Sequence, residues 1–342
     1  MKLLDMHCDT MLRIFQSEGK ENLQKNTLHV DEEKMLEGAV LAQFFAMYLD
    51  IKEYNDPYKI CVQMLEGFEL QLKNCTKIKK ACSYDEILEN ERQGFMSAII
   101  AIEEGAVLEG SMEKLYSLFD KGVRSITLTW NYPNEIGFPN HLLDYRDKGL
   151  TTFGKNAVGE MEKLGIIPDA SHLSDAGFYD LIDICKKPFL ATHSNCRALC
   201  DHPRNLTDDM IKKLAEKGGV SGLTYESFFL VKQSKRLEEL AKSWSTVASY
   251  ENSLIETEIS KKTQVGKIED VVKHGLHMLD IGGEDFPAIG GDLDGTMNVA
   301  GFKHIGETIR LADAFHDAGL SWDKVEKIMY KNAMRVIKDT MV

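Results

Sequence analysis

The sequence predicts an α/β protein built as a (β/α)8 TIM-type barrel, and three observations carry this prediction. Eight short apolar runs alternate with segments of helical periodicity, an alternation that is typical of a parallel sheet. Most of these runs are almost continuously apolar, as expected for strands that are buried on both faces. The sequence contains neither GxGxxG nor GxxxxGK[ST], the phosphate-binding patterns that would favour an open sheet. Eight strands therefore indicate a closed barrel.

The predicted strands and helices follow one another along the chain. Strands are expected at residues 2–7, 40–49, 95–103, 123–130, 165–172, 188–194, 219–225 and 286–294. Helical periodicity marks residues 57–75, 111–122, 152–165 and 207–219. Thr207, followed by two acidic residues, is typical of a helix N-cap, and Gly165 and Gly218 are typical helix ends.

One long charged segment interrupts the alternation between the seventh and eighth strands. It covers residues 226–264 and carries Trp244. We expect a helical insertion over the mouth of the barrel, within a single domain that spans residues 1–342. A linker between two domains is the alternative, and it is less favoured because the eighth strand follows the segment.

Composition and charge exclude several classes of function. The chain has 342 residues, of which 43% are hydrophobic and 28% charged, as in globular proteins that bury a large core. Its net charge of −13 argues against nucleic acid or an anionic membrane as a partner. No apolar stretch reaches the roughly 18 residues of a membrane span, and no secretory signal is recognisable at the N-terminus. The seven cysteines form no CxxC pair, so we expect reduced thiols and a cytoplasmic location.

Residues with metal-binding side chains stand at the ends of the predicted strands. The first strand runs into MHCDT, where His7 and Asp9 are two residues apart and should project from the same face, with Cys8 opposite. An imidazole and a carboxylate that converge in this way suit a divalent metal such as zinc. Further strand ends carry Glu103, His172, His193 and Asp292. A barrel enzyme builds its site at these carboxyl ends, so the shared placement predicts a metal site.

Each of these residues also has a structural interpretation, which its own context leaves open. His7 and Asp9 could form a hydrogen-bonded pair, and His193 could be a core histidine with satisfied hydrogen bonds. His172 could belong to a helix start that is capped by Ser174. Glu103 could be a capping or salt-bridged carboxylate, and because Glu104 is adjacent, at most one of the two should face the barrel centre.

The remaining polar residues give weaker signals. Asp294 is expected to stabilise a turn, and the two glycines before Asp292 should allow a close approach of backbone or ligand. Histidines at helix-like positions, including His274, are expected to be surface or packing residues. No functional role is expected for His29, His141, His202 and His304.

In this order, the strand-end motifs resemble the membrane dipeptidase (renal dipeptidase) family, peptidase family M19, whose members are binuclear zinc enzymes of the amidohydrolase superfamily. The resemblance extends over nearly the whole chain, up to YKNAMRV at residues 330–336. The motifs that carry it are MHCDT, AIEEG, the fourth-strand sequence ITLTW, DASHLS, ATHSN with HPRNLTDD, and GGDLDGT.

The resemblance implies a role for each matching residue. His7 and Asp9 would bind one zinc, His172 and His193 the other, and Glu103 would bridge both, so that a hydroxide between the two ions attacks the substrate. Asp292 would transfer its proton to the departing amine. Arg204 would hold a substrate carboxylate, for which a guanidinium is the matching fork, and a surface ion pair is the alternative. The family also suggests a homodimer.

One position departs from the family pattern. Mammalian members carry a histidine at the end of the fourth strand, where this chain has Trp130, followed by Asn131. The indole offers one N–H group and an apolar wall, and Asn131 could donate a hydrogen bond to the same region. Substrate specificity is therefore the property that this departure puts in doubt.

The resulting prediction is a zinc-dependent metallo-dipeptidase that hydrolyses small dipeptides, with tolerance for a D-residue at the second position. Two alternatives stay open: a related amidohydrolase acting on another small amide, and a catalytically inactive barrel used as a binding scaffold. The presence of all five ligand candidates and of Asp292 argues against the inactive barrel.

Overall fold

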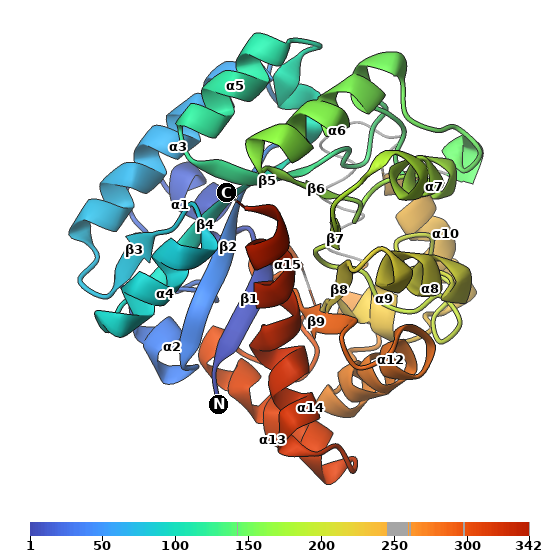
Figure 1. Cartoon of the computed structure of the whole chain (residues 1–342). Coiled ribbons are helices and arrows are strands. Elements are labelled where there is room, and N and C mark those ends of the chain that lie inside the picture. Colours follow the sequence, from blue (N-terminus) through green and yellow to red (C-terminus); the bar gives the residue numbers. More distant parts are fainter. Residues whose placement is uncertain (142, 245–258, 260, 297, 342) are drawn as a thin grey trace.

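The computed structural model describes residues 1–141, 143–244, 259, 261–296 and 298–341. Within these ranges, eight parallel strands close into a barrel, and helices form a ring around it (Figure 1). The barrel order is β2-β1-β9-β8-β7-β6-β5-β4, and pairing between β2 and β4 closes the circle. The (β/α)8 barrel expected from the sequence is therefore confirmed. The strands are β1 (Leu3–Cys8), β2 (Val40–Tyr48), β3 (Ile78–Lys80), β4 (Met96–Glu103), β5 (Val123–Thr127), β6 (Ile167–Asp169), β7 (Leu190–Ala191), β8 (Val220–Leu223) and β9 (Pro287–Ile289).

The helices occupy the connections between the strands and the C-terminal part of the chain. Thr207 caps one of them by accepting a hydrogen bond from the backbone N–H of Met210, and Gly165 ends another with φ 80°, as expected. The α-helices are α1 (Thr10–Gln16), α2 (Glu32–Glu37), α3 (Pro57–Asn74), α4 (Tyr84–Arg92), α5 (Met112–Asp120), α6 (Thr152–Leu164), α7 (Asp175–Ile184), α8 (Asp208–Glu216), α9 (Ser227–Leu230), α10 (Lys235–Trp244), α12 (Ile268–Gly282), α13 (Arg310–Asp317), α14 (Trp322–Glu326) and α15 (Asn332–Thr340). Shorter helical turns are η1 (Gly105–Leu108), η2 (Leu143–Tyr145), η3 (Ile305–Ile309) and the π-turn η4 (Lys327–Lys331).

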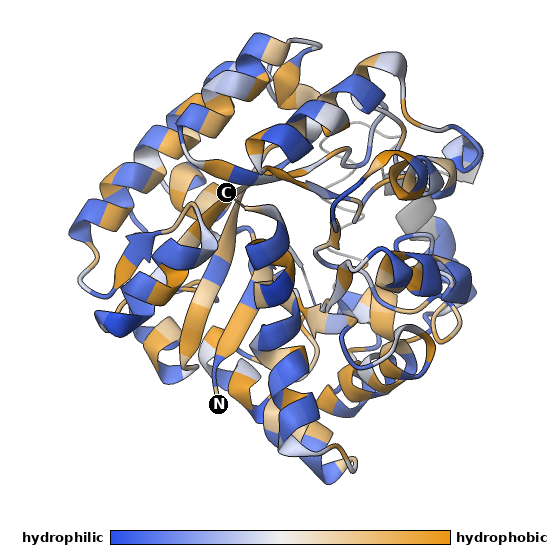
Figure 2. Ribbon diagram, in the orientation of Figure 1, coloured by the Kyte–Doolittle hydropathy of each residue, from blue (hydrophilic) through white to orange (hydrophobic). Residues whose placement is uncertain are grey.

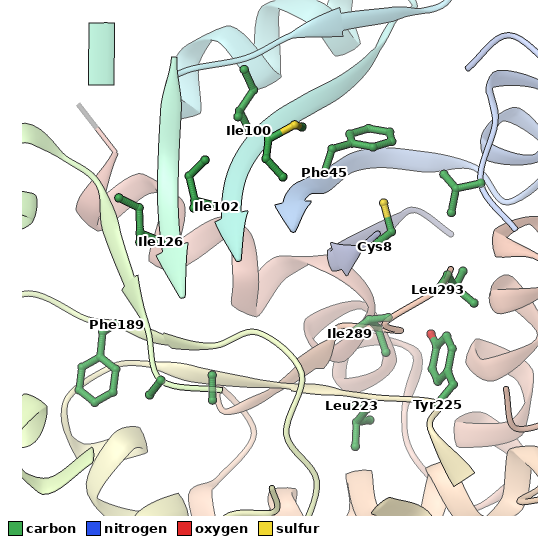
Figure 3. Packing of buried hydrophobic residues seen from close by; sticks show 14 of the residues in the cluster. Cys8, Phe45, Ile100, Ile102, Ile126, Phe189, Leu223, Tyr225, Ile289 and Leu293 are labelled. Carbon is green, nitrogen blue, oxygen red and sulfur yellow. The ribbon is translucent and has the colours of Figure 1, made fainter. Parts of the chain in front are cut away.

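Two apolar layers hold the barrel together. Between strands and helices, Phe45 of β2 packs with Ile100 and Ile102 of β4 in one large cluster (Figure 3). Figure 2 shows the matching pattern on the helices, whose hydrophobic residues alternate with hydrophilic ones. Inside the barrel, early strand residues such as Ile99 share a second cluster with Ile337 of α15. This apolar filling occupies the amino-terminal part of the barrel and leaves the carboxyl ends of the strands for polar side chains.

Five strands end at least two residues earlier than the sequence predicts. The predicted ranges 123–130, 165–172, 188–194, 219–225 and 286–294 end as strands at Thr127, Asp169, Ala191, Leu223 and Ile289. The physical reason is visible beyond β6, β7 and β9, where backbone N–H groups of Ser171, Thr192 and Gly291 donate to buried aspartates rather than to a neighbouring strand. The short strand β3, which pairs with the start of β4, was not predicted.

The predicted insertion at residues 226–264 contains the helices α9 and α10. Phe228, Leu237 and Ile259 from this segment form a small apolar cluster of their own. Residues 245–258 and 260 lie outside the described residues, so the insertion as a whole stays a prediction.

Two further expectations concern the environment of the chain. All seven cysteines are free thiols, as the absence of CxxC pairs predicts. Over the ranges that the structure describes, none of the helices combines the length and the apolar character needed to span a bilayer. The cytoplasmic location itself stays a prediction.

Candidate metal centre

The structure brings the predicted ligand residues together at the carboxyl ends of the barrel strands. They come from the ends of four different strands and the residues that follow them. The side chains of His7, Asp9, Glu103, His172 and His193 are all buried. Asp292 reaches the same cluster and is the most open, with 15% of its side chain exposed. The site is therefore a buried polar cluster with one carboxylate at its rim.

Glu103 lies at the centre of this cluster, and its two carboxylate oxygens face different groups. One oxygen, Oε2, is 3.1 Å from His7 Nε2. The other, Oε1, is 3.0 Å from His172 Nε2 and 3.6 Å from His193 Nε2. The two latter nitrogens are themselves 3.0 Å apart. The carboxylate of Glu103 thus lies between two sets of possible ligand atoms. The first set surrounds His7, and the second consists of the Nε2 atoms of His172 and His193.

The first set gathers around His7. Its Nε2 atom is 3.5 Å from Asp9 Oδ2 and 3.8 Å from Asp292 Oδ1. The other oxygen of Asp9, Oδ1, is buried and accepts no hydrogen bond from the described residues. Gly295 allows the two aspartates to approach, because a Cβ atom at this position would lie 2.0 Å from Asp9 Oδ2 and 2.4 Å from Asp292 Oδ1.

Buried backbone contacts position the first set. The carboxylate of Asp5 accepts hydrogen bonds from the backbone N–H groups of His7 and Gly291, and so ties the end of β1 to the segment after β9. The N–H of Asp292 donates in turn to the carbonyl of His7. Gly290 was expected to permit a close approach, and a Cβ atom there would lie only 1.7 Å from the carbonyl oxygen of Thr192.

Burial and charge shift the pKa values of the carboxylates and of His7. Burial raises the pKa of Glu103 to about 7 and that of Asp292 well above its ordinary range, where the charges of Asp9 and Glu103 add to the effect. Burial alone would lower the pKa of His7. The carboxylates of Glu103 and Asp9 outweigh burial and hold that pKa well above its ordinary value. The first set therefore attracts a positive charge.

In the second set, which consists of the imidazoles of His172 and His193, the pKa values are shifted in the opposite direction. Burial lowers the pKa values of His172 and His193 well below the ordinary histidine value, and the charge of Arg204 contributes in the same direction. Both rings are therefore neutral near pH 7. A neutral imidazole keeps one lone pair, and the lone-pair form is the one that binds a metal.

Arg204 places a positive charge beside the cluster. The residue is 3% exposed, and its guanidinium lies 5.4 Å from the ring centre of Phe229. One nitrogen, Nη2, donates to the carbonyl of His193 at 3.4 Å, whereas Nε and Nη1 are buried and have no hydrogen-bond partner among the described residues. Burial lowers the pKa of Arg204 to about 10, so the group stays charged near neutral pH. The alternative of a surface ion pair is wrong, because the side chain is buried and the ion pairs found in the described part of the chain do not include it.

Trp130 lies beside His172, with ring centres 6.3 Å apart. It also contacts Tyr48 at 4.9 Å and Tyr132 at 5.7 Å between ring centres. Asn131, the next residue along the chain, is buried. These aromatic rings therefore lie on one side of His172.

Two acidic residues next to the cluster, Glu104 and Asp294, make structural hydrogen bonds outside it. Glu104 points away from the cluster and accepts hydrogen bonds from the backbone N–H groups of Ala106 and Trp130, so only Glu103 of this pair faces the barrel centre. Asp294 accepts hydrogen bonds from the hydroxyl of Thr10 and the backbone N–H of His29. Its contacts are structural, as expected, but they join two segments that are distant in sequence rather than the turn that was predicted.

Sequence reasoning missed several residues near the cluster. Tyr48 ends β2 directly beside Glu103 in the strand register, and a search of strand ends for tyrosine would have found it. No role was expected for His141, yet the N–H of the preceding Asn140 donates to the carbonyl of His172. Burial and the charge of Arg204 lower the pKa of His141 to about 4. The loop that carries His141 gave no signal, because its packing depends on contacts distant in sequence.

Comparison with known sequences identifies one family over the whole chain. The sequence model described as membrane dipeptidase (peptidase family M19) matches residues 1–341. A protein encoded near pqqA in Klebsiella pneumoniae is 26% identical over 292 residues, which are 83% of this chain and 97% of that protein. An uncharacterised dipeptidase of Schizosaccharomyces pombe is 24% identical over 332 residues, 92% of this chain and 73% of the relative.

Solved structures share the same fold. A metallopeptidase from Rhodobacter sphaeroides, bound to a phosphinate mimic of L-Ala-D-Ala, superposes with a TM-score of 0.84 at 22% identity and 99% coverage of both chains. The probable dipeptidase PvdM from Pseudomonas aeruginosa gives a TM-score of 0.85 at 19% identity, over 99% of this chain and 96% of that one. At these identities the likeness concerns the fold, and the family assignment comes from the sequence match. The chain belongs to the membrane dipeptidase family, peptidase family M19, and its enzyme class is that of the metallo-dipeptidases.

Proposed function

We propose that this protein is a zinc-dependent dipeptidase that binds two zinc ions per chain. His7 and Asp9 hold one ion, His172 and His193 hold the other, and Glu103 bridges them. The observation that carries the proposal is the position of Glu103, with Oε2 at 3.1 Å from His7 and Oε1 at 3.0 Å from His172. A carboxylate whose oxygens face two separate ligand sets has the arrangement that a bridging ligand requires.

The residues fit zinc in type as well as in position. Imidazole nitrogen and carboxylate oxygen are usual zinc ligands, and catalytic sites leave positions open for water and substrate. The buried oxygen Asp9 Oδ1 has no hydrogen-bond partner among the described residues, and a cation would satisfy it. Without a cation, His7 and Arg204 would have to offset the charge of three neighbouring carboxylates, those of Asp9, Glu103 and Asp292.

When bound, the zinc ions supply an activated water molecule near neutral pH and polarise the peptide carbonyl. The remaining chemistry falls to the side chains. Asp292 accepts the proton of the attacking water and delivers it to the amine that leaves. Its raised pKa and its partly open position at the rim support this role.

Arg204 holds the C-terminal carboxylate of the substrate. Its Nε and Nη1 atoms are buried without a hydrogen-bond partner among the described residues, and a carboxylate can accept from both. A fixed distance between this anchor and Glu103 would restrict the enzyme to short peptides. Trp130, beside His172, would offer an apolar wall to the substrate, and the buried Asn131 a hydrogen-bond donor.

The Rhodobacter metallopeptidase with its L-Ala-D-Ala mimic suggests the stereochemistry to test. The proposed substrates are therefore L-L dipeptides and L-D dipeptides with a D-residue at the second position. Another small amide is the second candidate, because Trp130 stands beside His172 at the position where mammalian members carry a histidine.

A hydrolysis screen tests the proposal. The purified protein is assayed with L-L dipeptides, L-D dipeptides, N-acyl amino acids and cyclic amides, each with and without a metal chelator. Hydrolysis of dipeptides that the chelator abolishes and zinc restores is the expected result. Turnover of only the other amides would replace the dipeptidase with a different amidohydrolase. A zinc-loaded protein inert toward every substrate would favour the binding scaffold.

A further inference from the structure

Asp169, the last residue of β6, is a buried carboxylate that lies next to the proposed zinc site without belonging to it. Its oxygen Oδ1 accepts hydrogen bonds from the N–H of Ser171 at 3.0 Å, the hydroxyl of Ser171 at 2.7 Å and the N–H of Thr192 at 2.8 Å. Its oxygen Oδ2 accepts from the hydroxyls of Thr127 and Thr192, both at 2.6 Å. Five donors surround this one carboxylate, which offers about four lone-pair sites, so both of its oxygens act as acceptors in these contacts.

This assignment determines where the hydroxyl proton of Thr192 lies. A threonine hydroxyl carries a single proton, and Thr192 donates it to Asp169. The same oxygen, Thr192 Oγ1, is 2.8 Å from His193 Nδ1 and 3.0 Å from the hydroxyl oxygen of Ser171, whose own proton goes to Asp169. Because its proton is already engaged, the oxygen must accept in this second contact, and Nδ1 of His193 must carry the hydrogen.

The tautomer of His193 follows. A neutral imidazole with a hydrogen on Nδ1 has its lone pair on Nε2. In the structure, Nε2 is the atom that faces the cluster, 3.6 Å from Glu103 Oε1 and 3.0 Å from His172 Nε2. The lone pair therefore points to the position where a metal ion would lie.

The carboxylate also holds the backbone that carries both imidazoles. Beyond the ends of β6 and β7, the N–H groups of Ser171 and Thr192 donate to Asp169. The hydroxyl oxygen of Ser171 then accepts from the N–H of His193 at 3.1 Å. Beyond the ends of β6 and β7, the side chain of Asp169 therefore holds the two segments together in place of strand pairing.

We propose that Asp169 is a positioning residue that holds His193 in its Nδ1–H tautomer through the hydroxyl of Thr192. Metal-binding histidines usually donate their second ring hydrogen to an acceptor that orients the ring, and here that acceptor is a hydroxyl made to accept by a carboxylate behind it. The inference rests on the proposed function in one respect only, namely that His193 Nε2 binds zinc.

The substitution Asp169→Asn tests the relay at nearly constant shape. Two backbone N–H groups point at the Oδ1 position, so the amide oxygen must take that place and the NH2 group must face Thr127 and Thr192. Thr192 then accepts from the amide, and its own proton turns toward His193 Nδ1. The expected result is a switch of His193 to the Nε2–H tautomer, as a wrong tautomer follows from loss of the carboxylate in serine proteases.

The first measurement is made on metal-free protein, so it does not depend on the proposed function. Histidine is labelled with ¹⁵N, and long-range ¹H–¹⁵N NMR spectra are recorded at about pH 8, above the ordinary histidine pKa. His193 should show a hydrogen on Nδ1 in the wild type and on Nε2 in Asp169→Asn. A wild-type His193 with its hydrogen on Nε2 would overturn the inference.

The second measurement titrates Zn²⁺ against a competing chelator. Loss of partners that orient a metal ligand typically weakens binding about 10- to 100-fold, and we expect this for one of two zinc ions in Asp169→Asn and in Thr192→Val. Thr127→Val is the matched control: it removes a hydrogen bond to the same carboxylate but leaves Thr192 and His193 untouched, so both affinities should stay within about 3-fold of the wild type.

The outcomes separate the inference from the proposed function. If Asp169→Asn and Thr192→Val bind both zinc ions like the wild type, the inference is wrong and the zinc site stands. If the wild type binds no zinc, the proposed function fails, and the NMR spectra still decide the tautomer. Should Asp169→Asn not fold, Thr192→Val carries the test, since it removes the acceptor of the Nδ1 hydrogen without touching the carboxylate.

Discussion

At the scale of single residues, the backbone at Asp292 restricts which side chains this position accepts. Asp292 has φ 58°, in the left-handed region that only glycine, asparagine and aspartate adopt readily. The N–H of Asp292 donates to the carbonyl of His7, so the turn also fixes the distance between these two residues. A conservative substitution can therefore remove the carboxylate without changing the turn.

The substitution Asp292→Asn should lower turnover about 10²- to 10⁴-fold, the usual range for loss of general acid–base catalysis. Asparagine tolerates φ 58° but cannot carry a proton between water and amine. Steady-state kinetics and elemental analysis check the prediction together, because the variant should retain its zinc. Turnover near the wild-type value would contradict the role proposed for Asp292.

Replacing Arg204 should affect binding of the substrate carboxylate. In Arg204→Ala, KM should rise about 100-fold for dipeptides with a free C-terminus, because a buried charge-assisted pair contributes on the order of 3 kcal/mol. The matched comparison uses the same dipeptides with an amide at the C-terminus. An equal rise in KM for the amides would show that Arg204 does not bind the carboxylate.

His274 makes the stability of the fold depend on pH. It lies in α12, accepts a hydrogen bond from the N–H of Cys196 on Nδ1, and its Nε2 is 3.0 Å from the carbonyl of Leu230. Burial lowers its pKa to about 4. Between about pH 6.5 and 4, the unfolded chain therefore binds a proton that the folded chain does not, so stability is present above this range and falls as the pH decreases.

Urea unfolding of wild type and His274→Gln at pH 7.5 and pH 4.5, with chelator present, measures this contribution. Across that range the wild type should lose about 3 kcal/mol more than the variant, which has no titrating group at this position. Comparing each protein with itself removes any constant cost of the substitution. Equal losses in both proteins would mean that His274 titrates normally in the fold.

At the scale of elements, strand prediction succeeded where burial on both faces makes the sequence continuously apolar. β4 was predicted at 95–103 and runs from Met96 to Glu103, and all its residues are buried. β6 and β7 are much shorter than predicted because Asp169 binds the backbone N–H groups that would otherwise continue the sheet. Such competition between side chain and strand depends on residues from different elements, so a linear pattern does not reveal it.

Gly290, directly after β9, lies so close to Thr192, directly after β7, that its substitution gives a prediction for the packing of these elements. In Gly290→Ala, the new Cβ atom would lie 1.7 Å from the carbonyl oxygen of Thr192, so the backbone must move. We expect a loss of about 3 kcal/mol or more in the free energy of unfolding, as for other overpacked cores. In Gly159→Ala, within α6, a Cβ atom meets nothing within 4 Å, and about 0.5–1 kcal/mol should be gained. Similar stabilities of the two variants would contradict this account.

At the scale of the whole molecule, the barrel explains why residues far apart in the sequence could be assigned to one region. Strand ends share one rim of a parallel barrel, so His7, Glu103 and His193 were expected together, and they lie together. The approach of His141 to Arg204 could not be predicted, because it depends on how a loop folds over the rim.

Zinc that binds only the folded chain should also raise the free energy of unfolding, by about 3 kcal/mol when the free ion exceeds its dissociation constant about 100-fold.

The central claim is a two-zinc site bridged by Glu103, and zinc content tests it most directly. Elemental analysis of the wild type should give about two zinc ions per chain, and removal by a chelator should abolish dipeptide hydrolysis. Glu103→Gln should bind fewer ions and lose activity. Glu104→Gln, whose side chain points away from the cluster, should keep both ions. A metal-free protein that hydrolyses dipeptides at full rate, or a fully loaded and active Glu103→Gln, would contradict the claim.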